Sequence, residues 1–160
     1  MRDVVSNTSP LLYLHQLGQL DLLGSLYSKV VVPQSVVEEL DAGRVGGYEV
    51  PAVSALPWIE MVSSPNLTLL ALATDLGRGE SEAIAVAHER HALLILDDAL
   101  ARRHAGLLGI ECTGTLGVLL KAKAVGHLTE VAPLVERLVE LGFRLHPRTR
   151  DAVLRLAGKE

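Results

Sequence analysis

The chain has 160 residues, of which 49% are hydrophobic and 21% charged, and its formal net charge is -4. This length and composition indicate one globular domain over residues 1–160, with no linker, repeat or disordered region. The negative net charge excludes a protein that binds nucleic acid through a broadly basic surface. An aromatic content of 3% excludes a base-stacking platform.

Oxygen-bearing side chains are the main source of polar chemistry in this sequence. The single cysteine, Cys112, excludes an internal disulfide and a multi-cysteine zinc site, and the six histidines show no metal-ligand spacing. No stretch approaches the ~18 consecutive apolar residues of a membrane-spanning helix, and the start of the chain lacks the layout of a signal peptide. We therefore expect a cytoplasmic protein with no membrane association.

Short β-branched runs alternate with longer helical segments along the chain. In chain order we expect strand 4–5, helix 11–26, strand 30–32, helix 34–40, strand 59–62, helix 67–76, helix 80–91, strand 92–96, helix 99–108, strand 110–113, helix 116–124 and two helices within residues 130–160. Gly18 and Gly24 are expected to break the first helical segment. This alternation predicts a three-layer α/β fold with a parallel sheet.

The first helical segment is richer in leucine than one buried face requires. Leu17, Leu20 and Leu23, with nearby Tyr13, are therefore candidates for a dimer or partner surface.

Polar groups follow several of the predicted strands. Asn7 follows the first strand, Asp97 and Asp98 follow strand 92–96, and Thr113 and Thr115 lie at the end of strand 110–113. In open parallel sheets, ligands bind in the crevice outside the carboxyl ends of the strands. An acid in such a position is also a common helix cap, so each residue alone is weak evidence. Together they indicate a shared oxygen-rich edge of the sheet.

Two helices add further carboxylates to this pattern, Glu38 and Glu39 on one and Glu80 and Glu82 at the start of another. Clustered carboxylates repel one another, and a hard divalent cation removes that cost. Mg²⁺ and Mn²⁺ prefer oxygen ligands, and such a site can activate water against a phosphodiester. The spacing therefore favours metal-assisted hydrolysis over acid caps and solvated helix faces that share no function.

Several segments carry a resemblance to a known family. They are residues 5–11 (VSNTSPL), 31–40 (VVPQSVVEEL), 79–85 (GESEAIA), 94–98 (LILDD) with Ala101-Arg102, and 114–119 (GTLGVL) with Ala122-Lys123. In this order, over about residues 3–126, they resemble the PIN domains of the group related to VapC-like toxins. The resemblance implies a parallel four- or five-stranded sheet flanked by helices and an Mg²⁺- or Mn²⁺-dependent nuclease. Many members cleave RNA, act as toxins held inactive by a small antitoxin, and form dimers.

The resemblance also implies roles for particular residues. The first acid of the family falls on Asn7, the second best on Glu39 with Glu38 beside it, and the third on Glu82 with Glu80 assisting. The fourth falls on Asp97 or Asp98. Adjacent strand residues face opposite ways, so only one of these two is expected to point at the metal, and Asp98 is favoured. The supporting positions are Ser6, Thr8, Glu80 and Thr115.

Asn7 departs from the family pattern, in which the first acid is usually Asp. An amide oxygen is a neutral ligand, so two outcomes follow. The chain is either a metal-dependent ribonuclease with Asn7 as a neutral ligand, or a weak or inactive PIN-like module that binds nucleic acid or a protein. The ribonuclease is our main prediction.

The basic residues are unevenly distributed. Residues 141–160 carry a balance of +3, whereas residues 1–140 carry -7. Lysines and arginines also lie on the helices after the acid-bearing strand ends, and the candidates for RNA-phosphate contacts are Arg102, Arg103, Lys121 and Lys123. A solvated helix face is the competing explanation for these four side chains.

Overall fold

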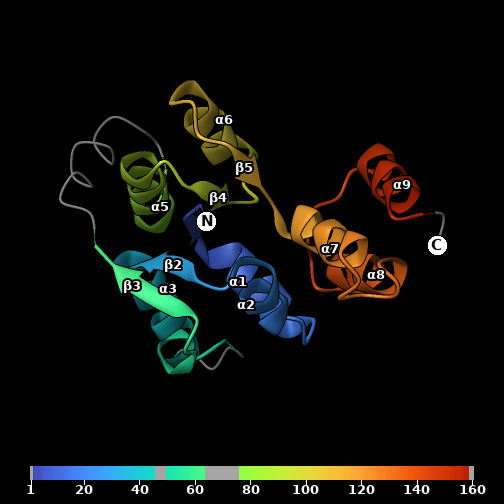
Figure 1. Ribbon diagram of the computed structural model, residues 1–160, viewed down its shortest axis with the longest axis horizontal. Coiled ribbons are helices and arrows are strands. Elements are labelled where there is room, and N and C mark those ends of the chain that lie inside the picture. The colour runs from blue at the N-terminus through green and yellow to red at the C-terminus, as the bar shows by residue number, and fades with distance from the viewer. Residues whose placement is uncertain (1, 46–49, 64–75, 159–160) are drawn as a thin grey trace.

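A computed structural model describes residues 2–45, 50–63 and 76–158 (Figure 1). Most of the predicted helix 67–76 lies outside these ranges. The strands are β1 (Val4–Ser6), β2 (Val30–Pro33), β3 (Ile59–Val62), β4 (Leu93–Ile95) and β5 (Cys112–Thr113). The helices are α1 (Thr8–Gln16), α2 (Asp21–Tyr27), α3 (Gln34–Val45), α5 (Arg78–Arg90), α6 (Ala99–Leu107), α7 (Thr115–Ala124), α8 (Ala132–Glu140) and α9 (Pro147–Leu156), with a 3-10 turn at Val53–Ala55.

The strands form one five-stranded parallel sheet in the order β3-β2-β1-β4-β5. The predicted α/β fold with a parallel sheet flanked by helices is confirmed. Short runs such as Val30–Val32 lack the apolar-polar alternation of a half-exposed strand because helices cover both faces of a parallel sheet.

Successive residues of one strand enter two different hydrophobic cores. Val4 belongs to a core shared with α1, α2, α3 and α7, whereas Val5 belongs to a core shared with α5 and α6. Ile95 and Leu94 of β4 divide in the same way. This division gives the three layers, and it leaves the carboxyl ends of the strands as an edge on which polar groups can gather.

The leucine-rich first segment differs from our expectation. It is broken around Gly18, whose φ of +72° favours glycine, but Gly24 lies inside α2. A Cβ at Gly24 would lie 2.9 Å from the Trp58 ring, so this glycine allows close packing rather than a turn. Leu20 and Leu23 are buried in the core. These two side chains are therefore not available for the predicted dimer or partner surface, whereas Leu17 and Tyr13 are only partly buried, and the surface itself stays a prediction.

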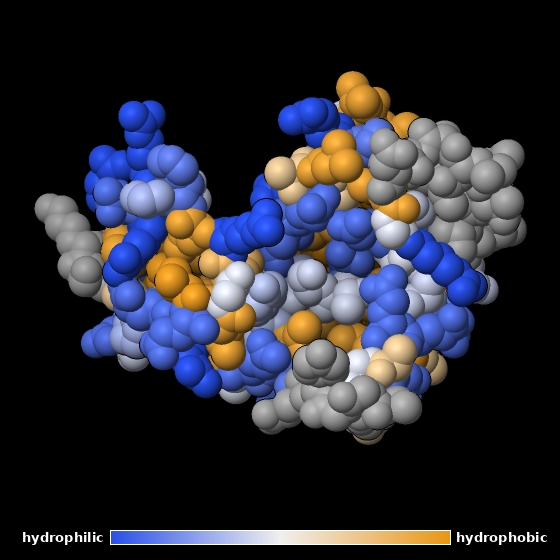
Figure 2. Space-filling model, turned by 180° about the vertical axis from the view of Figure 1, so that it is seen from behind, coloured by the Kyte–Doolittle hydropathy of each residue, from blue (hydrophilic) through white to orange (hydrophobic). Residues whose placement is uncertain are grey.

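The C-terminal helices share the core of the sheet. Val135 and Leu138 of α8 and Val153 of α9 are buried in the cluster that contains Val4 and Leu11. Seen from behind, the molecule is hollowed between its C-terminal helices and α6, and hydrophilic residues line much of this hollow (Figure 2). None of the described helices combines the length and the apolar character that crossing a bilayer requires.

Candidate functional site

The sheet places the polar strand ends at its topological switch point. β1 has β2 on one side and β4 on the other, and ligands of open α/β sheets bind where the strand order reverses in this way. Asn7 directly follows β1, and Asp97 and Asp98 follow β4. The Asn7 backbone N–H donates to the carbonyl of Ile95 at 3.0 Å, which joins the two strand ends. The structure thus brings these residues to one edge.

Asn7 is a buried polar residue at this edge. It is 4% exposed and occupies the N-cap position of α1, yet its side chain makes no capping hydrogen bond. Its Oδ1 atom has no hydrogen-bond partner among the described residues. The neighbouring Ser6 hydroxyl donates to the carbonyl oxygen of Asn7 at 3.0 Å. A buried acceptor left without a donor costs about 1–3 kcal/mol, so Oδ1 is suited to a ligand.

Glu39 is fixed by two segments that flank the same edge. The Thr8 hydroxyl donates to Oε2 at 2.6 Å, and the Gly79 backbone N–H donates to Oε1 at 2.9 Å. A Cβ at Gly79 would lie within 2.9 Å of the Glu39 carboxyl carbon. Glycine at position 79 therefore allows the start of α5 to approach Glu39, and Glu39 points toward the beginnings of α1 and α5.

Glu82 is engaged in holding two helices together. It is 3% exposed, and Oε1 accepts from both the backbone N–H of Ser35 at 2.8 Å and the Ser35 hydroxyl at 2.7 Å. Ser35 is the second residue of α3, so the Glu82 carboxylate satisfies a donor at the positive end of that helix. Glu82 therefore anchors the helix that carries Glu39.

Glu80, at the start of the same helix as Glu82, lies near other acidic groups. Burial and then the negative charge of Asp98 raise its pKa, and Glu39 raises it further, against a hydrogen bond from the Gly77 backbone that lowers it. The charges of Asp98 and Glu39 therefore act on the Glu80 carboxylate. The family motif favours Glu82 as the third acid with Glu80 assisting, whereas the Glu82 carboxylate is bound by Ser35 and the Glu80 carboxylate is repelled by Asp98 and Glu39.

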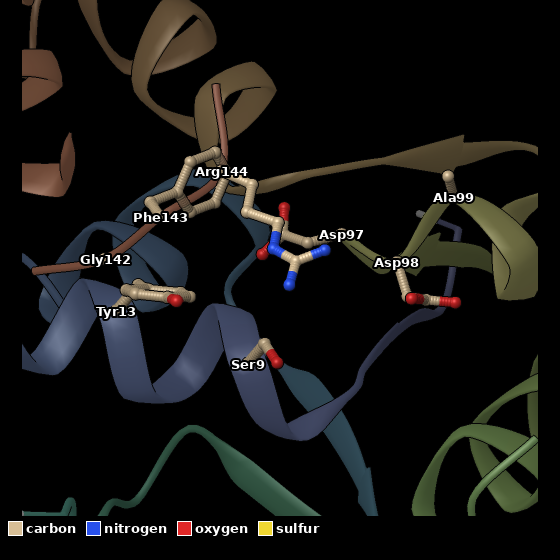
Figure 3. A pocket seen from close by; sticks show the side chains of 8 residues that line it. All are labelled: Ser9, Tyr13, Asp97, Asp98, Ala99, Gly142, Phe143 and Arg144. Carbon is tan, nitrogen blue, oxygen red and sulfur yellow. The ribbon is translucent and has the colours of Figure 1, made fainter. Parts of the chain in front are cut away.

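The two adjacent aspartates have different partners. Both oxygens of Asp97 are bound by Thr115, Oδ1 by its backbone N–H at 2.8 Å and Oδ2 by its hydroxyl at 2.7 Å. Burial raises the pKa of Asp97 more than these bonds and the nearby Arg102 lower it. Asp98 is exposed and caps α6, since its Oδ2 accepts from the Ala101 backbone at 2.8 Å. The two side chains point apart (Figure 3), as expected for neighbours at a strand end.

Gly114 lets the end of β5 approach Asp97. A Cβ at this position would lie 2.7 Å from Asp97 Oδ1 and 3.4 Å from an Arg102 guanidinium nitrogen. Glycine at this position leaves room for the carboxylate and the guanidinium, much as Gly79 leaves room for Glu39.

The basic residues that we expected near phosphate are widely separated. Arg102 lines a cavity with Asp97 at the strand ends, whereas Arg103 lies on the exposed surface of α6. Lys121 lies over the Tyr27 ring, 4.4 Å from its centroid, near the amino ends of β1 and β4. The Lys123 ammonium is 3.6 Å from a Cβ built at Gly158, beyond the end of α9. Only Arg102 of the four lines this cavity.

Two cavities of about 420 and 430 Å³ adjoin Asp97. The first is lined by Ser9, Tyr13, Asp98 and the segment 142–144, and the second by Arg102, residues 112–114 and the segment 143–146. Figure 3 shows the Arg144 guanidinium pointing into the first cavity. The sequence places Arg144 in the basic tail, and nothing in its spacing indicates that the tail folds back to the strand ends.

Comparison with known proteins identifies the fold family. A family profile described as DUF3368, a PIN domain, matches residues 3–159. The chain belongs to the PIN-domain family. Members of this family are generally nucleases. The match includes the segment that contains α8 and α9, which lies beyond the motifs quoted from residues 3–126.

A solved structure supports the same assignment. A PilT N-terminus domain protein from the hyperthermophilic archaeon Sulfolobus solfataricus is similar to this PIN domain, with 26% identity and a TM-score of 0.54. The alignment covers 74% of this chain and 92% of the archaeal chain. No curated protein matches the sequence significantly.

The donor chemistry of this PIN domain fits a hard divalent cation. Asn7 supplies a buried oxygen that has no donor among the described residues, and a cation would neutralise the repulsion that Asp98 and Glu39 exert on Glu80. PIN-domain nucleases typically use divalent metals. Within the described ranges, however, no three His, Cys, Asp or Glu side chains are already placed around one point. The candidate ligands therefore have suitable chemistry without forming a preassembled cage.

Proposed function

We propose that this PIN domain is an endoribonuclease that hydrolyses RNA phosphodiester bonds with Mg²⁺ or Mn²⁺. One observation carries the proposal. At the switch point of the sheet, the buried Oδ1 atom of Asn7 has no donor among the described residues, and the nearby Glu80 carboxylate is repelled by Asp98 and Glu39. An acid with a raised pKa, such as Glu80, beside such a crevice is typical of a functional site.

The proposed metal ligands are Asn7, Glu39 and Asp98, with Glu80 as the third carboxylate. When bound, the cation would polarise a phosphoryl oxygen and lower the pKa of water. Asn7 would contribute a neutral oxygen whose position is set by its burial. Asp97 is held by Thr115 and Glu82 by Ser35, so we assign these two acids to positioning: Asp97 fixes the start of α7, and Glu82 fixes the helix that carries Glu39.

Cleavage of a labelled single-stranded RNA in Mn²⁺ tests this function. We expect the wild-type chain to cut and the Asp98→Asn and Glu80→Gln variants to lose at least about tenfold in rate, since each loses a charged ligand. Glu130→Gln, at an exposed position on another part of the chain, is the matched control and should cut normally. Undiminished cleavage by both site variants would contradict the assignment.

We further propose that the chain is the toxin of a toxin–antitoxin pair in the cytoplasm and forms a homodimer. The motifs shared with VapC-like toxins support this role. Expression in a bacterial host should arrest growth for the wild-type chain and not for Asp98→Asn, and light scattering should give twice the monomer mass of 17.2 kDa. Equal growth with both chains would argue against a toxin, and a monomeric mass against the dimer.

Asn7 favours one alternative, a PIN-like module that binds nucleic acid or a protein without cutting. A neutral amide at the place of the usual acid weakens the attraction for a cation. If the wild-type chain binds RNA but does not cut it, and Asn7→Asp restores cleavage, the alternative is the better description. If the wild-type chain cuts in Mn²⁺, the alternative is excluded.

A further inference from the structure

We propose that the segment joining α8 to α9, residues 142–146, forms one wall of the substrate site and that Arg144 binds a backbone phosphate of single-stranded RNA there. This inference rests on the proposed ribonuclease function. It names a substrate-binding residue outside the family motifs, on the opposite side of the cavity from α1. Arg144 lines both cavities that adjoin Asp97, so an RNA strand leaving the acidic crevice would pass its side chain.

The segment is anchored on both sides of Arg144. Phe143 packs edge-to-face against Tyr13 of α1, with ring centroids 5.1 Å apart, and Leu145 also packs against the main core. His146 then caps α9, since its Nδ1 accepts from the Arg148 backbone N–H at 3.1 Å. With both neighbours held against the core, the exposed side chain of Arg144 is directed into the cavity (Figure 3).

The guanidinium of Arg144 is available for a ligand. It forms no hydrogen bond or ion pair with any residue in the described parts of the chain, although Asp97 lines the same cavity. Both oxygens of Asp97 already accept from Thr115, and the basic residue that lowers the pKa of Asp97 is Arg102. A guanidinium has five donors in a planar fork that matches a phosphate, so an unused one beside a carboxylate crevice suits a phosphodiester.

The cavities on either side of Arg144 supply a path for such a strand. One is bounded by Asp98 and Ser9, and the other is bounded by Arg102. Arg144 therefore lies between the acidic edge proposed to hold the cation and a second basic side chain. The +3 balance of residues 141–160 adds attraction for a polyanion on this side of a chain that is negative overall.

Binding of a short fluorescein-labelled single-stranded RNA, with divalent cations chelated, tests the role of Arg144. We expect Arg144→Gln to weaken binding about tenfold and to reduce the slope of log affinity against log salt by about 0.7 to 1, because one phosphate contact is lost. Arg144→Lys keeps the charge and should keep the slope. Arg155→Gln removes the same charge from an exposed position of α9 and should resemble the wild-type chain.

Cleavage kinetics in Mn²⁺ separate this inference from the proposed function. Arg144→Gln should raise KM about tenfold and leave kcat within about twofold, as expected for a contact made equally before and during reaction. If the wild-type chain cuts RNA while Arg144→Gln and Arg155→Gln have equal KM values and equal salt slopes, the role of Arg144 is overturned and the ribonuclease survives. If the wild-type chain neither binds nor cuts RNA, both proposals fail. Thermal unfolding of each variant identifies any loss of folding.

Discussion

At Glu80, the charge that the proposed metal site uses lowers the stability of the folded chain. Burial and the charges of Asp98 and Glu39 raise its pKa, so its ionised form costs the folded chain free energy. A glutamine at this position keeps the oxygen that accepts from Gly77 and removes the charge. Glu80 also caps α5, so a variant that keeps this hydrogen bond isolates the effect of the charge.

Glu80→Gln should stabilise the free chain at neutral pH by about 0.5 kcal/mol, a small value because Glu80 is only half-buried. A raised folded-state pKa means that ionised Glu80 lowers stability above the ordinary value of 4.5, so the advantage of glutamine should disappear as the pH falls below that value. Urea unfolding at neutral and acidic pH measures this. An advantage that grows on acidification would contradict it, and Glu130→Gln serves as the control.

Gly79 is a second residue whose identity the site requires. In Gly79→Ala the new methyl group would overlap the Glu39 carboxylate and displace it from the Gly79 N–H. We expect cleavage to fall at least about tenfold, while the free energy of unfolding changes by less than about 1 kcal/mol because alanine favours the helix.

Gly106→Ala is the matched control for Gly79→Ala. Gly106 lies in α6 with no atom within 4 Å of a built Cβ, so alanine should stabilise the helix by about 0.5–1 kcal/mol and leave cleavage unchanged. Normal cleavage by Gly79→Ala would mean that the position of Glu39 does not matter.

At the scale of elements, α6 depends on the same aspartate as the proposed metal site. Asp98→Ala removes the N-cap and should cost about 1 kcal/mol in unfolding free energy, whereas Asp98→Asn keeps the capping oxygen and should cost much less. Both variants should lose cleavage, because each removes the charged ligand. Urea unfolding and RNA cleavage of the pair separate the two roles. Equal stability of the two variants would remove the capping role.

At the scale of the whole molecule, the C-terminal helices should unfold together with the sheet. Leu138 of α8 is fully buried in the core that contains Val4 of β1, so Leu138→Ala should cost about 2–5 kcal/mol. Trp58 lies against α2 and packs on the same core, so its fluorescence reports the unfolding of this core. We expect the urea unfolding transitions followed by Trp58 fluorescence and by helical circular dichroism to shift together to lower urea concentration in Leu138→Ala.

Leu156→Ala is the control for this experiment, since Leu156 is 76% exposed and its loss should change stability little. A Trp58 transition that does not move in Leu138→Ala would mean that α8 and α9 unfold independently of the sheet.

The sequence by itself determined the alternation of strands and helices, the parallel sheet and the position of polar residues after several of the strands. These features depend on local periodicity and on the general rule that parallel strands end at one edge. Asn7, Asp97 and Asp98 could therefore be placed at this edge of the sheet, whereas Glu39 was indicated by the resemblance to PIN domains. The leucines of α1 and α2 could not be assigned to the core or to the surface from the sequence. Composition does not reveal that several elements, including α8 and α9, pack against them.

Tertiary structure alone decided which groups each carboxylate contacts, and that Arg144 lines the cavities beside Asp97. Glu80 and Glu82 are two residues apart on α5. Only the packing of α3 against α5 lets Ser35 bind the Glu82 carboxylate and leaves the Glu80 carboxylate exposed to the charge of Asp98. Arg144 is 46 residues from Asp98 in the sequence, and no local pattern predicts their proximity. The physical reason is that side-chain partners across a fold depend on long-range packing, whereas strand and helix periodicity is local.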